Sequence, residues 1–173
     1  KMMNEVIESQ VDMFVGDDQE TKDWDVAGLS QSLFEIIPVK LEIPKSEIEH
    51  LSKAEFKQLL KEAAVKLYEA KEAEFPEPEH IRELERIVLL RVIDRKWMDH
   101  LDDMEQLKQG IGLMAYGQRD PAVEYKIQGF EMFNDMIEGI KVETVKTLYH
   151  IQVEQKVERE EVAEVTGTNK DDT

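Results

Sequence analysis

The sequence predicts an all-α protein: a small helical subdomain followed by a long antiparallel helical hairpin. Three observations support this. Apolar residues recur at steps of three and four through most of residues 83–153, a spacing that places them on one helix face. A glycine-rich turn near residues 109–121 divides this stretch into two arms. The alternation typical of a strand is confined to residues 39–43, which is too short for a stable sheet.

Each arm of the predicted hairpin carries one apolar stripe. The first consists of Ile87, Leu90, Ile93, Trp97, Leu101, Met104, Leu107 and Ile111. The second consists of Ile127, Phe130, Phe133, Ile137 and Ile140, and continues more weakly through Thr144, Leu148 and Ile151. At ~1.5 Å per residue each arm is roughly 40–50 Å long. We expect the stripes to bury each other, with Trp97 against Phe130, Phe133 or Ile137.

The turn between the arms has clear boundary signals. Gly110 and Gly112 can adopt the left-handed conformation that ends a helix. Asp120 is placed to cap the second arm, with Pro121 at its first position and Glu124 in its first turn.

The turn itself forms the tip of the hairpin and is unusually apolar. Residues 106–118 contain no Asp or Glu, in a chain whose net charge is −17. Leu113, Met114 and Tyr116 stand among glycines. Either they fold back over the end of the hairpin, or they face outward, where Met and Tyr suit contact with a variable partner. The residues alone leave both interpretations open.

The first 80 residues predict a helical subdomain. Residues 1–15 form a helix with Met3, Val6, Ile7, Val11 and Phe14 inward, and residues 26–37 form another with Leu29, Leu33 and Ile36 or Ile37 inward. Trp24 covers an edge of this core, and Pro38 ends the second helix. Ser52 and Glu55 have the spacing of a capping box that opens a third helix, with Phe56, Leu60, Ala63 and Leu67 inward. Pro76-Glu77-Pro78 ends it and hinges the subdomain onto the hairpin.

Composition excludes several classes of function. Asp and Glu number 39 against 22 Lys and Arg, which argues against nucleic-acid binding. The absence of cysteine excludes disulfides and cysteine metal sites. No phosphate-binding G-x-x-x-x-G-K-[ST] motif is present, so we expect no ATP hydrolysis by this chain.

No apolar run approaches the ~20 residues of a membrane span. The opening Lys1-Met-Met-Asn-Glu5 is no signal peptide, and we expect a fragment of a longer protein.

Two groups of side chains invite a chemical interpretation. Glu47/His50 and Glu77/His80 have the Glu-x-x-His spacing of carboxylate-bridged metal sites, but neither lies mid-helix, so we expect no metal. The second group is Asp94, Asp99, Asp102, Asp103 and His100. We expect it to be a solvated helix face, with Asp99 paired to Arg95 or Lys96. The methionines Met98, Met104, Met132 and Met136 are interpreted as packing residues.

The run from Leu89 to Phe133, LLRVIDRKWMDHLDDMEQLKQGIGLMAYGQRDPAVEYKIQGFEMF, resembles the C-terminal helical scaffold of the SecA family, the motors of bacterial protein export. The resemblance implies four parts: the end of a long scaffold helix (1–15), a helical wing domain (16–78), a two-helix finger (79–156) and a disordered tail (157–173). It places the ATP- and magnesium-binding motor domains outside this chain. It also implies a cytoplasmic protein, peripheral at the inner (plasma) membrane. Met114 departs from the family, which often carries Arg there.

The resemblance also implies where partners bind. The finger tip contacts the translocating preprotein and the SecY channel, through Ile111, Leu113, Met114, Tyr116, Gln118 and Arg119. Tyr116 aligns with the aromatic tip residue of the family. Candidates for contact with the protein's own motor domains are Arg91, Asp94, Arg95 and Lys96. The alternative is a generic helical interaction or dimerisation module without a transport role.

Overall fold

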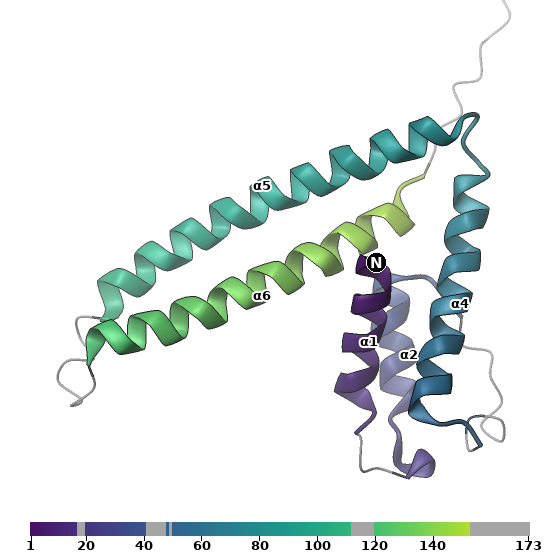
Figure 1. Ribbon diagram of the computed structural model, residues 1–173, viewed down its shortest axis with the longest axis horizontal. Helices are drawn as coiled ribbons and strands as arrows, with labels where there is room; N and C mark the ends of the chain where they lie inside the picture. The colour runs from purple at the N-terminus through teal and green to yellow at the C-terminus, as the bar shows by residue number, and fades with distance from the viewer. Residues whose placement is uncertain (17–19, 41–47, 49, 112–119, 153–173) are drawn as a thin grey trace, which may run out of the picture.

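The structure, a computed structural model, describes residues 1–16, 20–40, 48, 50–111 and 120–152. Its elements are α1 (Met2–Phe14), the 3₁₀ helix η1 (Thr21–Asp23), α2 (Val26–Ile36), α4 (Lys53–Glu72), α5 (Pro78–Ile111) and α6 (Pro121–His150). The fold is all-α, as predicted, with no strand in these ranges. Helices α1, α2 and α4 form a bundle, and α5 and α6 form a hairpin that extends away from it (Figure 1).

The hairpin is long. Its first helix has 34 residues and its second has 30, so at ~1.5 Å per residue they measure about 51 and 45 Å. Of the two glycines expected to be able to end this helix, Gly110 lies inside α5, which continues to Ile111 directly before Gly112. Gly112 and the rest of the predicted tip lie outside the described residues.

The predicted helix starts are confirmed. At α4 the Ser52 hydroxyl accepts from the Glu55 N–H at 3.2 Å, and the Glu55 carboxylate accepts from the Ser52 N–H at 2.8 Å, so the capping box is present. At α6 the Asp120 carboxylate accepts from the Ala122 N–H at 2.9 Å, with Pro121 in the first turn. Asp25 caps α2 in the same way through Gly28 N–H at 2.9 Å.

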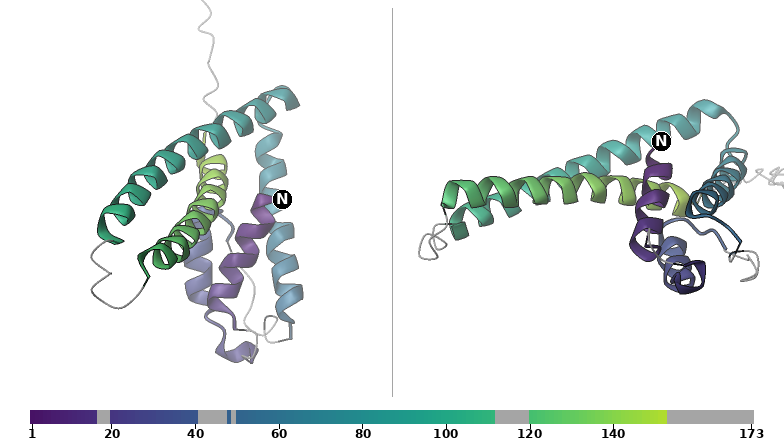
Figure 2. Two further views of the ribbon diagram at one scale, coloured as in Figure 1. Left: turned by 60° about the vertical axis from the view of Figure 1, so that its left-hand side comes forward. Right: turned by 60° about the horizontal axis from the view of Figure 1, so that its bottom comes forward.

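One core joins the bundle to the hairpin. It buries most of the predicted inward residues of α1, α2 and α4, and also two residues near the end of α6, while the predicted residues Met3, Phe14, Ala63 and Leu67 are only partly buried against it. Its buried members are Val6, Ile7, Val11, Val15, Leu29, Leu33, Ile36, Ile37, Val39, Phe56, Leu60, Ala64, Val145 and Tyr149. Trp24 packs on its edge as predicted, with its ring centroid 5.6 Å from that of Phe56. The base of the hairpin is therefore part of the bundle core, and Figure 2 shows α1 and α2 against one end of α6.

Ion pairs align α1 with its neighbours. Asp12 accepts from Lys53 at 2.6 Å and from Lys57 at 2.8 Å, both on α4. These hydrogen bonds lower the pKa of Asp12 below its ordinary value. On the other side of α1, Glu5 pairs with Lys141 of α6 at 3.0 Å.

Polar contacts also fix the end of α6 against α4. The Tyr149 hydroxyl donates to the Ala64 carbonyl at 2.8 Å, and burial raises the pKa of Tyr149. The Lys71 ammonium donates to the carbonyl of Tyr149 at 2.8 Å and also to that of Ile151. A cation is favourable at a helix C-terminus because the last carbonyls there lack helical partners. The subdomain therefore contacts the hairpin directly, besides being linked to it through Pro76-Glu77-Pro78.

Candidate functional site: the two faces of the hairpin

The inward orientation predicted for the apolar stripes is largely wrong. The first-arm residues Ile87, Leu90, Ile93, Trp97 and Leu101 are exposed, as are the second-arm residues Ile127, Phe130 and Phe133. Leu90 is 56% exposed and Phe130 is 67% exposed. Of the remaining stripe, Met104, Leu107, Ile111 and Ile137 are half-buried, while Ile140 and Thr144 are buried.

The hairpin core uses a different face of α5. Its buried residues are Val88 and Val92 of α5 and Met136 and Ile140 of α6. Leu84, Leu89, Ile137, Leu148 and Ile151 pack around them. Helix α5 thus has two apolar faces, and the smaller one packs against α6. The predicted mutual burial of the arms is therefore present, but it does not use the larger apolar face of α5.

We call the outward-facing residues of the hairpin the exposed apolar set. They are Ile87, Leu90, Ile93, Trp97, Met98, Leu101, Val123, Ile127, Phe130 and Phe133. The predicted burial of Trp97 is wrong, since 45% of it is accessible and its nearest ring is that of His100 at 5.8 Å. So many exposed apolar side chains on two adjoining helices are typical of a surface that another polypeptide covers.

A groove at the base of the hairpin has a volume of about 720 Å³. Three of the predicted motor-contact residues, Arg91, Asp94 and Arg95, line it together. The rest of its lining is Leu84, Ile87, Val88, Val92, Met98, Glu143, Thr147 and Ile151. The groove is thus largely apolar, with charged residues at its edge.

Glu143 of α6 binds two of the predicted motor-contact residues. It pairs with Arg95, and with Lys96 at 3.2 Å. The predicted pairing of Asp99 with Arg95 or Lys96 is therefore wrong, because both cations face the other helix. Arg91 is exposed at the groove without an ion pair to any described residue.

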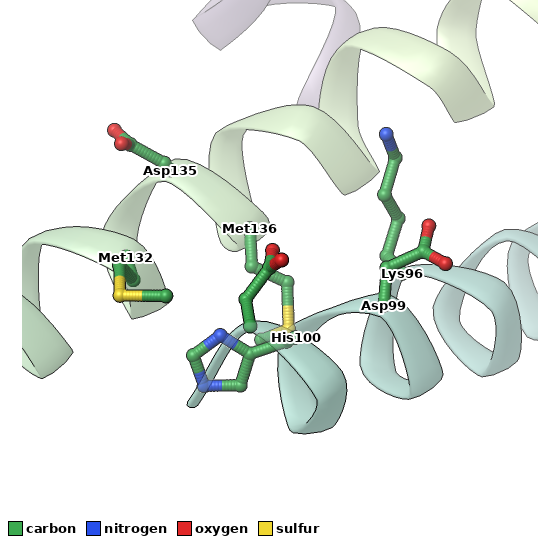
Figure 3. A pocket seen from close by; sticks show the side chains of 7 residues that line it. Lys96, Asp99, His100, Met132, Asp135 and Met136 are labelled. Atoms are coloured by element: carbon green, nitrogen blue, oxygen red, sulfur yellow. The ribbon is translucent and has the colours of Figure 1, made fainter. Parts of the chain in front are cut away.

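A smaller cavity, which we call the notch, lies farther along the hairpin and has a volume of about 290 Å³. It is lined by Lys96, Asp99, His100, Asp103, Met132, Asp135 and Met136 (Figure 3). His100 is only 8% exposed, so its predicted place on a solvated face is wrong, whereas Asp94, Asp99, Asp102 and Asp103 are exposed as predicted. The His100 ring lies 5.9 Å from that of Phe133.

The spacing of residues held a signal for His100 that the prediction missed. Val88, Val92, Lys96 and His100 recur at steps of four, which is the face of α5 that meets α6. The prediction chose the opposite face of α5 because that face carries the larger apolar side chains.

The remaining predicted sites are only partly described. Ile111 ends α5 and is half-buried, whereas Leu113, Met114, Tyr116, Gln118 and Arg119 lie outside the described residues. Glu47 also lies outside them, while His50, Glu77 and His80 are exposed. No three metal-ligating side chains come together within the described ranges.

Comparison with known proteins identifies the family. A family model described as the SecA Wing and Scaffold domain matches residues 1–152. The chain belongs to the SecA family. It is similar over 174 residues to the protein translocase subunit SecA of Lachnoclostridium phytofermentans, at 60% identity and covering 100% of this chain. The corresponding subunit of Clostridium novyi is 45% identical over 172 residues, covering 99% of this chain. The predicted SecA resemblance is thus confirmed.

The chain spans about 20% of the length of both of these SecA relatives. Among the described helices, none has the length and apolar character needed to cross a membrane. The described part of the chain corresponds to the wing and scaffold region of the family, as the matched model is named.

Proposed function

We propose that this chain is the wing and two-helix finger of a SecA-type protein-export ATPase. In this proposal the tip of the finger contacts the translocating preprotein and the SecY channel. The hairpin couples movement of the ATP- and magnesium-binding motor domains, which lie outside this chain, to movement of the polypeptide. The parent protein acts in the cytoplasm, at the inner membrane surface, and the chain itself is non-catalytic.

The observation that carries this proposal is the fixed base of a long hairpin. Helix α6 is held at its C-terminal end by the buried residues Val145 and Tyr149 and by Lys71. Its other end, at Pro121, is a helix length away, at about 45 Å. A lever of this kind transmits a displacement from its base to its tip, which contains Tyr116.

The exposed apolar set supports a further part of the proposal, in which the hairpin contacts the rest of the parent protein. The chain is a fifth of the length of its relatives, and its hairpin exposes large apolar side chains that a soluble surface rarely leaves uncovered. We propose that the motor domains cover this set and the neighbouring groove, with Arg91 and Asp94 at the edge of the contact.

Photo-crosslinking tests the tip contact. A photoreactive residue at position 116 of the full-length protein should crosslink to a preprotein stalled in the channel, and one at position 58, on α4, serves as a matched control. Gln58 is exposed, and among the described residues its side chain forms a hydrogen bond with Glu62 of its own helix. Equal crosslinking from both positions, or none from position 116, would refute the tip contact.

The exposed apolar set also favours a second candidate function, self-association of the chain. Sedimentation of the 173-residue chain at increasing concentration decides between them. A monomer agrees with the export proposal, whereas a dimer abolished by Leu90→Ser and Phe130→Ser would favour the dimerisation module.

A further inference from the structure

The corner between α4 and α5 is not held together by its backbone. Residues 73–77 connect the two helices, and Pro76 and Pro78 stand at the corner without an N–H to donate. The last backbone hydrogen bond on the α4 side has Phe75 as its donor, and the first on the α5 side has His80. Among the described residues, no backbone hydrogen bond crosses from one side to the other. Side chains therefore fix the angle at this corner (Figure 1).

Four side chains, which we call the corner cluster, join the two helices. They are Tyr68 and Glu72 of α4 and Arg82 and Glu85 of α5. The Tyr68 hydroxyl donates to Oε1 of Glu85 at 2.7 Å. The Arg82 guanidinium donates to the same Oε1 at 2.6 Å and to Glu72 at 2.5 Å. The Glu85 carboxylate is therefore the acceptor on which both donors converge.

The bond between Tyr68 and Glu85 is the sheltered contact of this cluster. The side chain of Glu85 is 29% exposed, against 57% for Arg82. Exposed ion pairs contribute little because water screens them, whereas a sheltered hydrogen bond to a charged acceptor is stronger. Burial, and next the hydrogen bond to Glu85, raises the pKa of Tyr68. The phenol therefore keeps its proton and remains a donor.

The corner cluster is a second attachment between the wing and the hairpin. The first is the shared core, in which Val145 and Tyr149 of α6 are buried and to which α5 contributes no described residue. The ring of Tyr68 lies 5.4 Å from that of Tyr149, so this one residue of α4 contacts both arms of the hairpin. A hairpin attached through α6 alone could turn about that attachment, whereas a second attachment at α5 fixes its direction.

We propose that Glu85 is a positioning residue, which sets the direction of α5 relative to the wing and thereby the position of the finger tip. It acts through Tyr68 and Arg82. The Pro76-Glu77-Pro78 stretch, which the sequence predicts to be a hinge, is then held at one angle as long as Glu85 keeps these donors. The effect on the tip rests on the proposed function of the finger, whereas the role of Glu85 at the corner does not.

The test measures the distance between the wing and α5 by pulsed electron paramagnetic resonance. The chain has no cysteine, so Lys66→Cys on α4 and Asp102→Cys on α5 provide one unique pair of spin labels at exposed positions. At ~1.5 Å per residue, position 102 is about 36 Å from Pro78, and a turn of about 10° at the corner moves it by about 6 Å. We expect one narrow distance distribution for the chain with an intact corner cluster.

Loss of the shared acceptor should widen this distribution. Glu85→Ala removes the oxygen that both donors use, and Tyr68→Phe removes a single hydroxyl, so each should spread the distance by about 6 Å or more. Glu85→Gln retains an acceptor oxygen for Tyr68 and should restore most of the narrow distribution. The matched control is Glu83→Ala, which breaks an ion pair with Arg86 inside α5 and should leave the distribution narrow. Circular dichroism should show the same helix content in all four variants.

Three results would each overturn the positioning role: distributions that stay narrow in both Glu85→Ala and Tyr68→Phe, equal broadening in Glu83→Ala, or no recovery in Glu85→Gln. In the full-length protein, Glu85→Ala should slow preprotein export relative to Glu83→Ala. A broadened distribution with unchanged export would support the positioning role and refute the proposed lever function. The tip contact is tested separately, by crosslinking from position 116.

Discussion

Tyr149→Phe tests whether the wing and the hairpin share one cooperative core. Tyr149 is 7% exposed, and its ring packs 5.4 Å from that of Tyr68 on α4. The substitution keeps the ring and removes the hydrogen bond to the Ala64 carbonyl. That carbonyl lies within α4 and retains its own helical bond, so no buried acceptor is orphaned. The expected loss is therefore about 1 kcal/mol, the net contribution of one hydrogen bond.

The measurement is urea and thermal unfolding with Trp24 as reporter, in a Trp97→Phe background. Trp24 lies in the wing, where it packs against the shared core and the ring of Phe56, so its emission responds when the wing loses stability. For a chain of this size about 1 kcal/mol corresponds to a Tm about 2–4 °C lower. The matched control is Phe130→Leu on the same helix. Phe130 is 67% exposed, so a change within about 0.5 kcal/mol is expected.

Two results would refute this reasoning. If Trp24 reports an unchanged wing while circular dichroism shows that α6 melts earlier, the two parts unfold separately and the shared core is wrong. If Phe130→Leu destabilises the wing as much as Tyr149→Phe, the effect does not come from the hydrogen bond across the core.

Three further predictions follow from named contacts. Lys71→Met keeps the apolar stem but removes two hydrogen bonds to the last carbonyls of α6, so it should lower the Tm by a few degrees. The control Lys66→Met, on the exposed side of the same helix, should leave the Tm unchanged. Equal effects of the two substitutions would contradict the account. Gly129→Ala places a methyl 3.1 Å from the Met104 methyl. Because that flexible end can shift, the gain in helix propensity of up to about 1 kcal/mol should dominate, and a lower urea midpoint would contradict this. The folded-state pKa of Asp12 is lowered by its lysine partners, so its stabilisation is present above the unfolded pKa of about 3.9 and lost as pH falls through the folded value. The stability difference between the native chain and Asp12→Asn should therefore shrink below about pH 4, and a difference constant from pH 7 to 3 would show that the ion pairs are not its source.

The sequence predicted the wing more accurately than the hairpin, for a physical reason. Each wing helix has one apolar face and therefore one way to bury it, as Leu29 and Leu33 of α2 show. Capping signals such as Ser52 and Glu55 act within a few residues and can be recognised locally. Both kinds of signal were confirmed by the structure.

The orientation of the hairpin could not be predicted in the same way. Helix α5 carries apolar residues on two faces, and periodicity does not say which of them meets α6. Val88 and Val92 were passed over for the larger Leu90 and Trp97, which remain exposed. The ion pairs of Glu143 depend on the register of two helices that are far apart in sequence at that point, and no local pattern specifies that register.

The central claim is that the larger apolar face of the hairpin points outward, and acrylamide quenching of Trp97 tests it most directly. In the Trp24→Phe chain, Trp97 is 45% exposed and its emission should be strongly quenched, approaching the value for the chain unfolded in urea. Trp24 in the Trp97→Phe chain, whose indole nitrogen is buried, provides the internal comparison and should be quenched less. A Trp97 that is as protected as Trp24, with blue-shifted emission in the monomeric chain, would contradict the outward-facing surface.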